Sequence, residues 1–347
     1  MRWKRGPGSG YAIVLIFSGA LIAGLVVQAG PWQLADRLAG ADLVLVTAAV
    51  LLYLLSIAVR ALRWHVLLRS ARHRVRGRVV LSQYAVGQAI NDLTPIKVAG
   101  EGARIWGVHR AEGVPIGTGL ATVVAEKVMD LVLVTAVLVA SVAVLYLSTP
   151  TGSWWPLAAV CGLVAGANLA VIVVLRRPDI VEWGGRISNR VARRFRGGRY
   201  ADEVGEKVER TIDSFDQARR GGRGSDRRWM FLAAALTIPV WALEFSRLAL
   251  IMAALGVLAS LPAVVVASSL AMTFQVFLPG GSGNITVIAD IFARTGVTLT
   301  TATAAGLLSV ATSIWISVPI ALVALAVASR RRLNEPASGA SGPRDGS

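Results

Sequence analysis

The sequence has little of what a soluble domain needs at its surface, and almost no cysteine. Only 16% of its 347 residues are charged, whereas soluble chains carry about 25%. The single cysteine, Cys161, lies in an apolar run, so no disulfide can form within the chain. Apolar sequence is abundant instead: 54% of the residues are hydrophobic and the mean hydropathy is +0.61. This composition suits a bilayer, in which a helical span needs about 20 apolar residues.

Other absences narrow the function. No G-x-x-x-x-G-K-[ST] sequence occurs, so ATP-driven transport is not expected. The net charge of +16 is of a kind that binds nucleic acid, but the basic residues fall between the apolar runs. Lys and Arg are enriched in the cytoplasmic loops of membrane proteins. The charge therefore indicates orientation in a membrane, and no nucleic-acid partner is expected.

Long apolar segments mark the expected membrane helices. They cover residues 11–30, 41–60, 80–93, 117–147, 155–175, 230–256 and 300–329, with an eighth, 262–278, that runs into Pro279-Gly280-Gly281. The first segment follows basic Met1–Arg5 and ends in Val27-Gln28-Ala29, so it resembles a signal peptide. Because many more spans follow, we interpret it as the first membrane helix.

Arginine-rich flanks predict the orientation. The N-terminus, the stretch 60–78 and the strongly basic insert 176–229 are expected in the cytoplasm. The uncharged stretch 148–154 is expected outside. The tail 331–347 is expected to be cytoplasmic and disordered, since it has nothing to bury. We predict one transmembrane domain over residues 1–330, in the cytoplasmic membrane, with both termini in the cytoplasm.

Two segments must then start and finish on the same side. Residues 80–112 start and finish on the cytoplasmic side, because the next span begins on that side. Residues 262–298 start and finish on the outer side. Each is expected to form two short helices that enter the membrane and turn back, at Thr94-Pro95 and at Pro279-Gly280-Gly281. The alternative is that these prolines merely kink ordinary spans.

The predicted fold is an all-α integral membrane protein with about six full spans and two broken re-entrant hairpins. The halves, about 41–147 and 230–329, match in inverted order around the basic insert. Inverted repeats with broken helices are a transporter architecture.

Ionisable side chains occur where hydrocarbon would surround them. Each charge facing lipid at mid-bilayer costs about 2.5–3.5 kcal/mol, so they are expected to face inward or to pair. They are Lys97, Glu101, Arg104, Glu126, Lys127, Asp130, Glu244, Arg247, Asp290 and Arg294.

Spacing predicts two pairs of opposite charge. Glu101 and Arg104 are three residues apart, as are Glu244 and Arg247, so each pair can meet on one helix face. We interpret Glu244 and Arg247 as a structural ion pair and assign the first pair to a substrate cavity. A purely structural role is the alternative for both, because buried ion pairs also specify helix packing.

Other charges need partners from elsewhere. Glu126 and Asp130 lie four residues apart, and two acids on one face repel unless a cation or a proton lies between them. Lys127 points about 100° away from Glu126 and can reach a neighbouring element. Asp290 and Arg294 are expected near the outer surface, in a structural or solvated role.

The glycine-rich break suggests an anion site. Gly280, Gly281 and Gly283 permit positive φ and close approach of a ligand to the backbone. A half-helix that begins near Ser282, with Asn284 in its first turn, would direct free N–H groups at a phosphate.

Three motifs carry a family resemblance. Asn91–Pro95 followed by Ala99–Arg104 resembles the N-x-x-x-P and G-E-x-x-R signature of the lysylphosphatidylglycerol synthase transmembrane (flippase-like) family. Ala121–Asp130 resembles its next motif, in which Arg usually follows Glu, and Pro279–Gly283 resembles its third. The motifs occur in the family's order over most of residues 80–330.

The resemblance implies a flippase-like role for anionic or aminoacylated phospholipids or polyprenyl-linked sugars. Two positions depart from the family: Thr286 stands where a Glu is usual, and Val310 where an Arg is common. Synthases of the family also carry a soluble aminoacyltransferase domain. This chain ends soon after its last span, so that activity is not expected.

We therefore predict a lipid flippase with a central polar cavity and no cofactor or metal. Its partner is a membrane lipid or a lipid-linked sugar phosphate, and Gly162 and Gly166 have the spacing of a helix-dimer contact. The residues expected to bind substrate are Asn91, Lys97, Glu101, Arg104, Glu126, Lys127, Asp130, Gly280, Gly281, Ser282, Gly283 and Asn284.

Two other functions stay open. An intramembrane enzyme acting on a lipid phosphate would hold Mg²⁺ through Glu101, Glu126 and Asp130. A membrane scaffold without transport is the third hypothesis, although buried charges argue against it.

Overall fold

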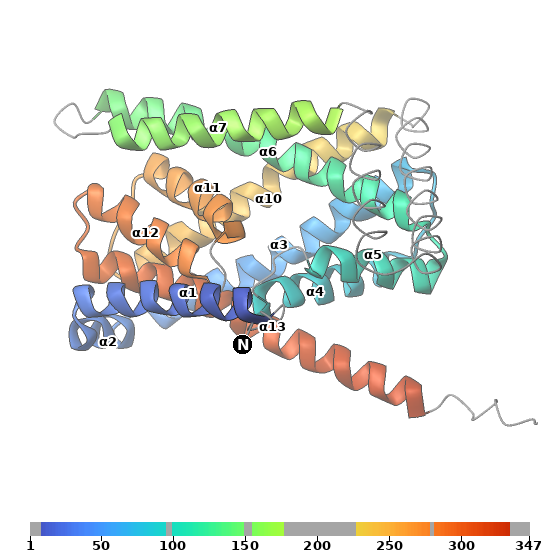
Figure 1. The fold of residues 1–347 in the computed structure, drawn as a ribbon, viewed down its shortest axis with the longest axis horizontal. Coiled ribbons are helices and arrows are strands. Elements are labelled where there is room, and N and C mark those ends of the chain that lie inside the picture. Colours follow the sequence, from blue (N-terminus) through green and yellow to red (C-terminus); the bar gives the residue numbers. More distant parts are fainter. Residues whose placement is uncertain (1–7, 95–98, 149–154, 177–226, 278–280, 334–347) are drawn as a thin grey trace, which may run out of the picture.

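The computed structural model describes residues 8–94, 99–148, 155–176, 227–277 and 281–333, and its regular elements there are all α-helices (Figure 1). In chain order they are α1 (Gly8–Ala29), α2 (Pro31–Ala39), α3 (Leu43–Ser70), α4 (Gly77–Leu93), α5 (Ala99–Glu112), α6 (Ile116–Ser148), α7 (Trp155–Arg176), α10 (Arg227–Ala254), α11 (Leu261–Phe277), α12 (Ser282–Arg294) and α13 (Leu299–Leu333). They follow the apolar segments of the sequence, which confirms the predicted all-α class.

Four helices are long and apolar enough to cross a membrane within the described residues: α3, α6, α10 and α13. Counting α1 and α2 as one broken span, bent by 85°, makes a fifth. Large apolar side chains on these helices are exposed, including Leu43 at 76% and Leu147 at 79%. Such a surface is unfavourable in water and favourable in lipid, so the chain is a multi-pass membrane protein.

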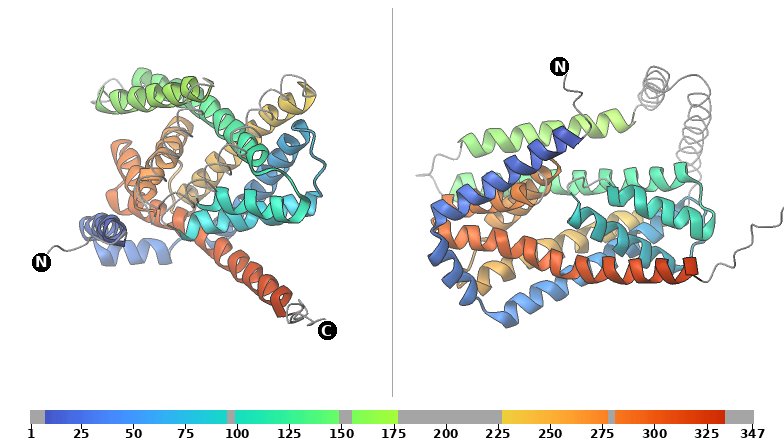
Figure 2. Two further views of the ribbon diagram at one scale, coloured as in Figure 1. Left: turned by 45° about the vertical axis from the view of Figure 1, so that its right-hand side comes forward. Right: turned by 60° about the horizontal axis from the view of Figure 1, so that its bottom comes forward.

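The two long helices α3 and α10 lie side by side through the middle of the bundle (Figures 1 and 2). Around them the two halves of the chain interleave. Helix α4 packs on α5 and on α13, whereas α11 packs on α12 and on α6. Helix α1 covers α12 and α13, and α7 lies along α6.

Helices α4 and α5 form the predicted first hairpin. Gly87 and Gly100 bring the two backbones together: a Cβ on Gly100 would lie 1.9 Å from the carbonyl oxygen of Gly87. At the base of the hairpin, Arg76 Nε donates to Glu112 Oε1 at 2.7 Å. The first and last residues of this segment therefore lie at the same end, as the sequence predicts.

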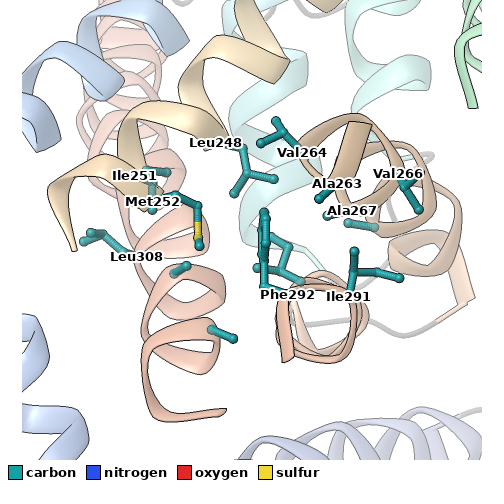
Figure 3. Packing of buried hydrophobic residues seen from close by; sticks show 14 of the residues in the cluster. Leu248, Ile251, Met252, Ala263, Val264, Val266, Ala267, Ile291, Phe292 and Leu308 are labelled. Atoms are coloured by element: carbon teal, nitrogen blue, oxygen red, sulfur yellow. The ribbon is translucent and has the colours of Figure 1, made fainter. Parts of the chain in front are cut away.

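Helices α11 and α12 pack together as the second hairpin, over the main apolar core (Figure 3). Phe292 of α12 is fully buried between Leu248 of α10 and Ala263 of α11. A large buried aromatic ring contributes strongly to core stability. This packing fixes α12 against α10, α11 and α13.

Three boundaries differ from the sequence prediction. Helix α3 does not end near residue 60 but continues to Ser70, because its arginines are paired inside the bundle. Residues 31–40, which lie between two of the predicted apolar segments, are mostly helix α2, with Pro31 in the favoured first position. Helix α13 extends to Leu333, so residues 331–333 of the expected disordered tail are helical. Residues 334–347 and most of the insert 176–229 lie outside the described residues.

Candidate functional site

A buried arginine that the sequence analysis assigned to a cytoplasmic flank organises the site. Arg63 of α3 donates from Nη1 and Nη2 to the two carboxylate oxygens of Asp130 on α6, at 2.6 and 3.0 Å. Its Nη2 also donates to Glu126 Oε1 at 2.9 Å. Trp241 Nε1 of α10 donates to Asp130 Oδ1 at 3.0 Å. Arg63 thus supplies the cation that the two neighbouring acids require.

Glu126 connects Arg63 to the first hairpin. Its Oε2 accepts from Arg104 Nη2 of α5 at 2.9 Å, and its Oε1 accepts from the Tyr84 hydroxyl of α4 at 3.1 Å. The Arg104 guanidinium lies between two aromatic rings, 4.5 Å from the centroid of Tyr84 and 4.7 Å from that of Trp64. Cation–π contacts of this kind are strongest in desolvated positions.

Glu101 and Lys127 complete the cluster at its more exposed edge. Glu101 binds Arg104 Nη2 at 2.5 Å, which confirms the pairing predicted from spacing, and Lys127 Nζ at 3.0 Å. The Lys127 side chain is 40% exposed. The side chains of this buried charge cluster are Arg63, Glu101, Arg104, Glu126, Lys127 and Asp130. Its three basic and three acidic groups cancel, so the cluster is neutral when all are ionised.

Some donors in the cluster are left open. Arg104 is 2% exposed, yet its Nε and Nη1 have no hydrogen-bond partner, and the same is true of Arg63 Nε. A buried donor without a partner costs about 1–3 kcal/mol. The unused nitrogens of Arg104 can bind the oxygen atoms of an anion, and arginine suits phosphate because it presents several donors in one plane.

Asn91 has a contact that explains its place in the motif. Its Oδ1 accepts from the backbone N–H of Gly100 at 2.8 Å, so it satisfies an otherwise free donor in the first turn of α5. The two arms of the hairpin are held together by this bond near their tip. Lys97 lies outside the described residues.

The predicted pair Glu244–Arg247 is present and belongs to a second polar group. Arg247 lies 3.4 Å from Glu244, and Arg60 of α3 binds the same carboxylate at 3.1 Å. Arg247 Nη1 also donates to the Ser309 carbonyl and to Thr312 of α13, at 3.0 and 3.2 Å. These bonds connect α10 to α3 and to α13.

The glycine break of the second hairpin places a helix start as predicted. Helix α12 begins at Ser282, after Gly281 in the left-handed region with φ 79°. A Cβ on Gly281 would lie 3.0 Å from the methyl groups of Val310. Gly283 is buried, and Asn284 Oδ1 is buried without a partner. Gly280 lies outside the described residues.

Two residues depart from the family motif in this region. Val310 packs against Gly281, and the Thr286 hydroxyl is buried without a partner. An apolar and a neutral side chain thus stand at the two positions where the resemblance implies a charged residue. Asp290 and Arg294 pair at 2.9 Å on an exposed face, 53% and 43% exposed, which agrees with the expected solvated role.

Within the described residues, no helix of the first hairpin packs on a helix of the second. In the described residues, α12 packs on α11, α13 and α1, and α5 packs on α4 and α6. Helix α13 lies between the hairpins, since it packs on both α4 and α12. The predicted site therefore divides into the buried charge cluster at the first hairpin and the glycine break at the second.

Several residues of the buried charge cluster and of the Glu244–Arg247 group were not predicted from the sequence. Arg60 and Arg63 were counted as flanking charge, although they lie three residues apart on the continuation of an apolar helix and can share a face. The three carboxylates considered as Mg²⁺ ligands each bind a basic side chain. No group of three or more metal-ligating side chains occurs among the described residues.

Long lipid-facing helices around paired buried charges define a polytopic α-helical membrane protein with a polar interior. The chain belongs to the family described as lysylphosphatidylglycerol synthase TM region, whose profile matches residues 11–321. A UPF0104 membrane protein of Methanothermobacter thermautotrophicus is 27% identical over 313 residues, covering 88% of this chain and 91% of that protein. Another UPF0104 membrane protein from the same organism is 25% identical over 292 residues, which cover 80% of this chain and 81% of that protein. No solved structure matches significantly.

Proposed function

We propose that the protein moves a lipid with an anionic or phosphate-linked headgroup across the cytoplasmic membrane. The observation that carries the proposal is Arg104, a buried guanidinium with two open donor atoms. Among the described helices, the hairpin that holds it packs on α3, α6 and α13. Ionisable groups inside a membrane protein mark substrate or ion pathways as a rule. The family to which the chain belongs makes a flippase role plausible.

Helix pairing supports the inverted-repeat arrangement behind this proposal. If α3 to α6 and α10 to α13 are equivalent, each central helix packs on its counterpart, α3 on α10. The hairpin of each half then packs on the last helix of the other: α4 on α13 and α11 on α6. Six full spans would be α1, α3, α6, α7, α10 and α13, with both termini in the cytoplasm.

The charge cluster suggests how a headgroup is bound. Lys127 at the exposed edge attracts an anionic headgroup. A phosphate can then replace Glu101 on Arg104 and use the open Nε and Nη1 donors as well. Because Arg104 is 2% exposed, the headgroup reaches it only when the α4–α5 hairpin moves. Among the described helices α5 packs only on α4 and α6, and its Trp106 is 56% exposed, so this element is suited to move.

Translocation by the purified protein tests the proposal. Full-length protein is reconstituted into phosphatidylcholine vesicles with tail-labelled fluorescent phosphatidylglycerol, and a membrane-impermeant reductant bleaches the outer leaflet. Wild-type protein is expected to expose the inner-leaflet label to the reductant, and Arg104→Ala to slow this at least tenfold, on the order of 1.4 kcal/mol. Arg294→Ala, which removes an exposed pair, is the control and is expected to match wild type.

Arg104→Lys distinguishes a loss of folding from a loss of lipid binding, because lysine keeps the positive charge but lacks the planar guanidinium group. A folded Lys variant with slowed transfer supports the proposal. Arg104→Ala protein that is folded and moves lipid at the wild-type rate contradicts it.

A further inference from the structure

Asp92 differs from the other acids inside the bundle. It lies on α4, two residues before Thr94, and its carboxylate is bound by neutral groups from three helices. The Tyr53 hydroxyl of α3 donates to Oδ2, Ser317 Oγ of α13 donates to the same oxygen at 2.5 Å, and Gln88 Nε2 donates to Oδ1 at 3.0 Å. Tyr53 and Ser317 are 5% and 1% exposed.

No basic side chain among the described residues forms an ion pair with Asp92. The other acids in this part of the bundle each have one: Glu101, Glu126, Asp130 and Glu244 all bind Arg or Lys. An ion pair holds a carboxylate in its charged form. Among the described residues, the half-buried Asp92 has hydrogen bonds from neutral groups instead.

The partners of Asp92 suit both of its protonation states. A hydroxyl donates to a carboxylate and accepts from a carboxylic acid after a simple rotation. Tyr53 and Ser317 can therefore stay bonded when a proton arrives, whereas an ammonium or guanidinium partner would lose its counter-charge. We propose that Asp92 is a reversible protonation site that couples lipid movement to the proton gradient, an inference that rests on the proposed transport function.

The charged and titratable groups around this site come from the packed helices. They are Tyr53 and Arg60 on α3, Tyr84 on α4, Glu101 and Arg104 on α5, and Glu244 and Arg247 on α10. The Arg247 guanidinium lies 5.3 Å from the centroid of the Tyr53 ring. It is already bound to Glu244 and to α13, which leaves Asp92 to change its charge alone.

The position of Asp92 links its charge to motion of the hairpin. It joins the tip of α4 to α3 of its own half and to α13 of the other half. Hydrogen bonds to an ionised group are about twice as strong as neutral ones. Binding of a proton from the aqueous phase therefore loosens the hairpin, and its release to the other phase tightens it again. The proton is bound and released without any other bond being made or broken.

Two measurements test the site. In the first, vesicles containing the fluorescent phosphatidylglycerol probe receive an imposed pH gradient. Wild-type transfer is expected to change severalfold with the direction of the gradient, whereas Asp92→Asn transfers at one rate in both directions. Asp290→Asn removes an exposed acid and is the matched control, expected to respond as wild type does. A gradient response that survives in Asp92→Asn overturns the inference and leaves the transport proposal intact.

The second measurement needs no lipid substrate. Infrared difference spectra of the purified protein at low and high pH are expected to contain a carboxylic-acid C=O band that is missing in Asp92→Asn and kept in Asp290→Asn. Ser317→Ala keeps the acid and is expected to keep this band. If the band is the same in wild type and Asp92→Asn, Asp92 does not titrate and the inference fails. If wild type moves no probe lipid, the transport proposal fails, while the band still decides on Asp92.

Discussion

Arg63 of α3 and Asp130 of α6, 67 residues apart in the sequence, are joined by two hydrogen bonds at 2.6 and 3.0 Å. The pair is fully enclosed, with the Arg63 side chain 0% exposed. Buried charges need excellent geometry to offset desolvation, and removing one partner leaves the other uncompensated. Removal of either side chain is therefore expected to weaken the packing of α3 on α6 more than the loss of an exposed ion pair would.

Replacement of Arg63 by methionine is expected to destabilise the protein by about 3–5 kcal/mol, because Glu126 and Asp130 lose their shared cation. The measurement is thermal unfolding in detergent, followed by size-exclusion chromatography. Arg76→Met is the control: its pair with Glu112 is 59% exposed on the arginine side and should contribute less than about 1 kcal/mol. Equal losses in the two variants would show that Arg63 is not a buried structural charge.

Substitution by alanine is expected to have very different effects on protein stability at two glycines of α5. A Cβ at Gly100 would lie 1.9 Å from the carbonyl oxygen of Gly87, so Gly100→Ala must separate the arms of the first hairpin. Gly102 has open space around its Cα, so Gly102→Ala should be neutral or stabilise by up to about 1 kcal/mol through helix propensity. Expression level and unfolding temperature of the two variants compare them directly. A harmless Gly100→Ala would contradict the close packing of α4 on α5.

Glu101 competes with an anionic headgroup for Arg104 in the proposed mechanism. Glu101→Gln removes the competing charge while keeping the size of the side chain, so it is expected to bind fluorescent phosphatidylglycerol severalfold more tightly. Arg104→Gln is expected to bind it more weakly. Titration of the labelled lipid in detergent micelles, with labelled phosphatidylcholine as the comparison, measures both. If both variants bind the labelled lipid more tightly, or both bind it more weakly, Glu101 does not compete with the headgroup for Arg104.

Single cysteines test the orientation of the hairpins. In a Cys161→Ala background, cysteines at Arg76 and Glu112 are expected to react with a membrane-impermeant thiol reagent from the cytoplasmic side only. These two residues contact each other, so they must label from the same side. Cysteines at Ser260 and Thr295 should react from the outside. Labelling of all four positions from one side would contradict the inverted arrangement.

Much of the fold could be predicted from apolar run lengths, because lipid requires long helices whose backbone groups are satisfied internally. The helix start at Ser282 and the Glu101–Arg104 pair also followed from local rules of glycine and of helix spacing. Contacts between distant segments did not follow. Arg63 was misassigned because an arginine near the end of an apolar run signals a cytoplasmic flank, and its partners lie far along the chain.

Asp92 was missed for a similar reason. Its partners Tyr53 and Ser317 come from helices before and after it, and hydroxyl groups leave no charge pattern in a sequence. The separation of the hairpins by α13 was also hidden, because inverted repeats show which segments are equivalent but not which ones touch.

The pairing of Arg63 also constrains how the chain is made. Helix α3 emerges from the ribosome long before α6, which supplies both Glu126 and Asp130. An unpaired arginine costs up to about 2.5–3.5 kcal/mol on insertion scales, the value for the centre of a membrane helix, and Arg63 has no counter-charge from α6 until that helix is made. We therefore expect α3 to settle fully in the membrane only when α6 arrives.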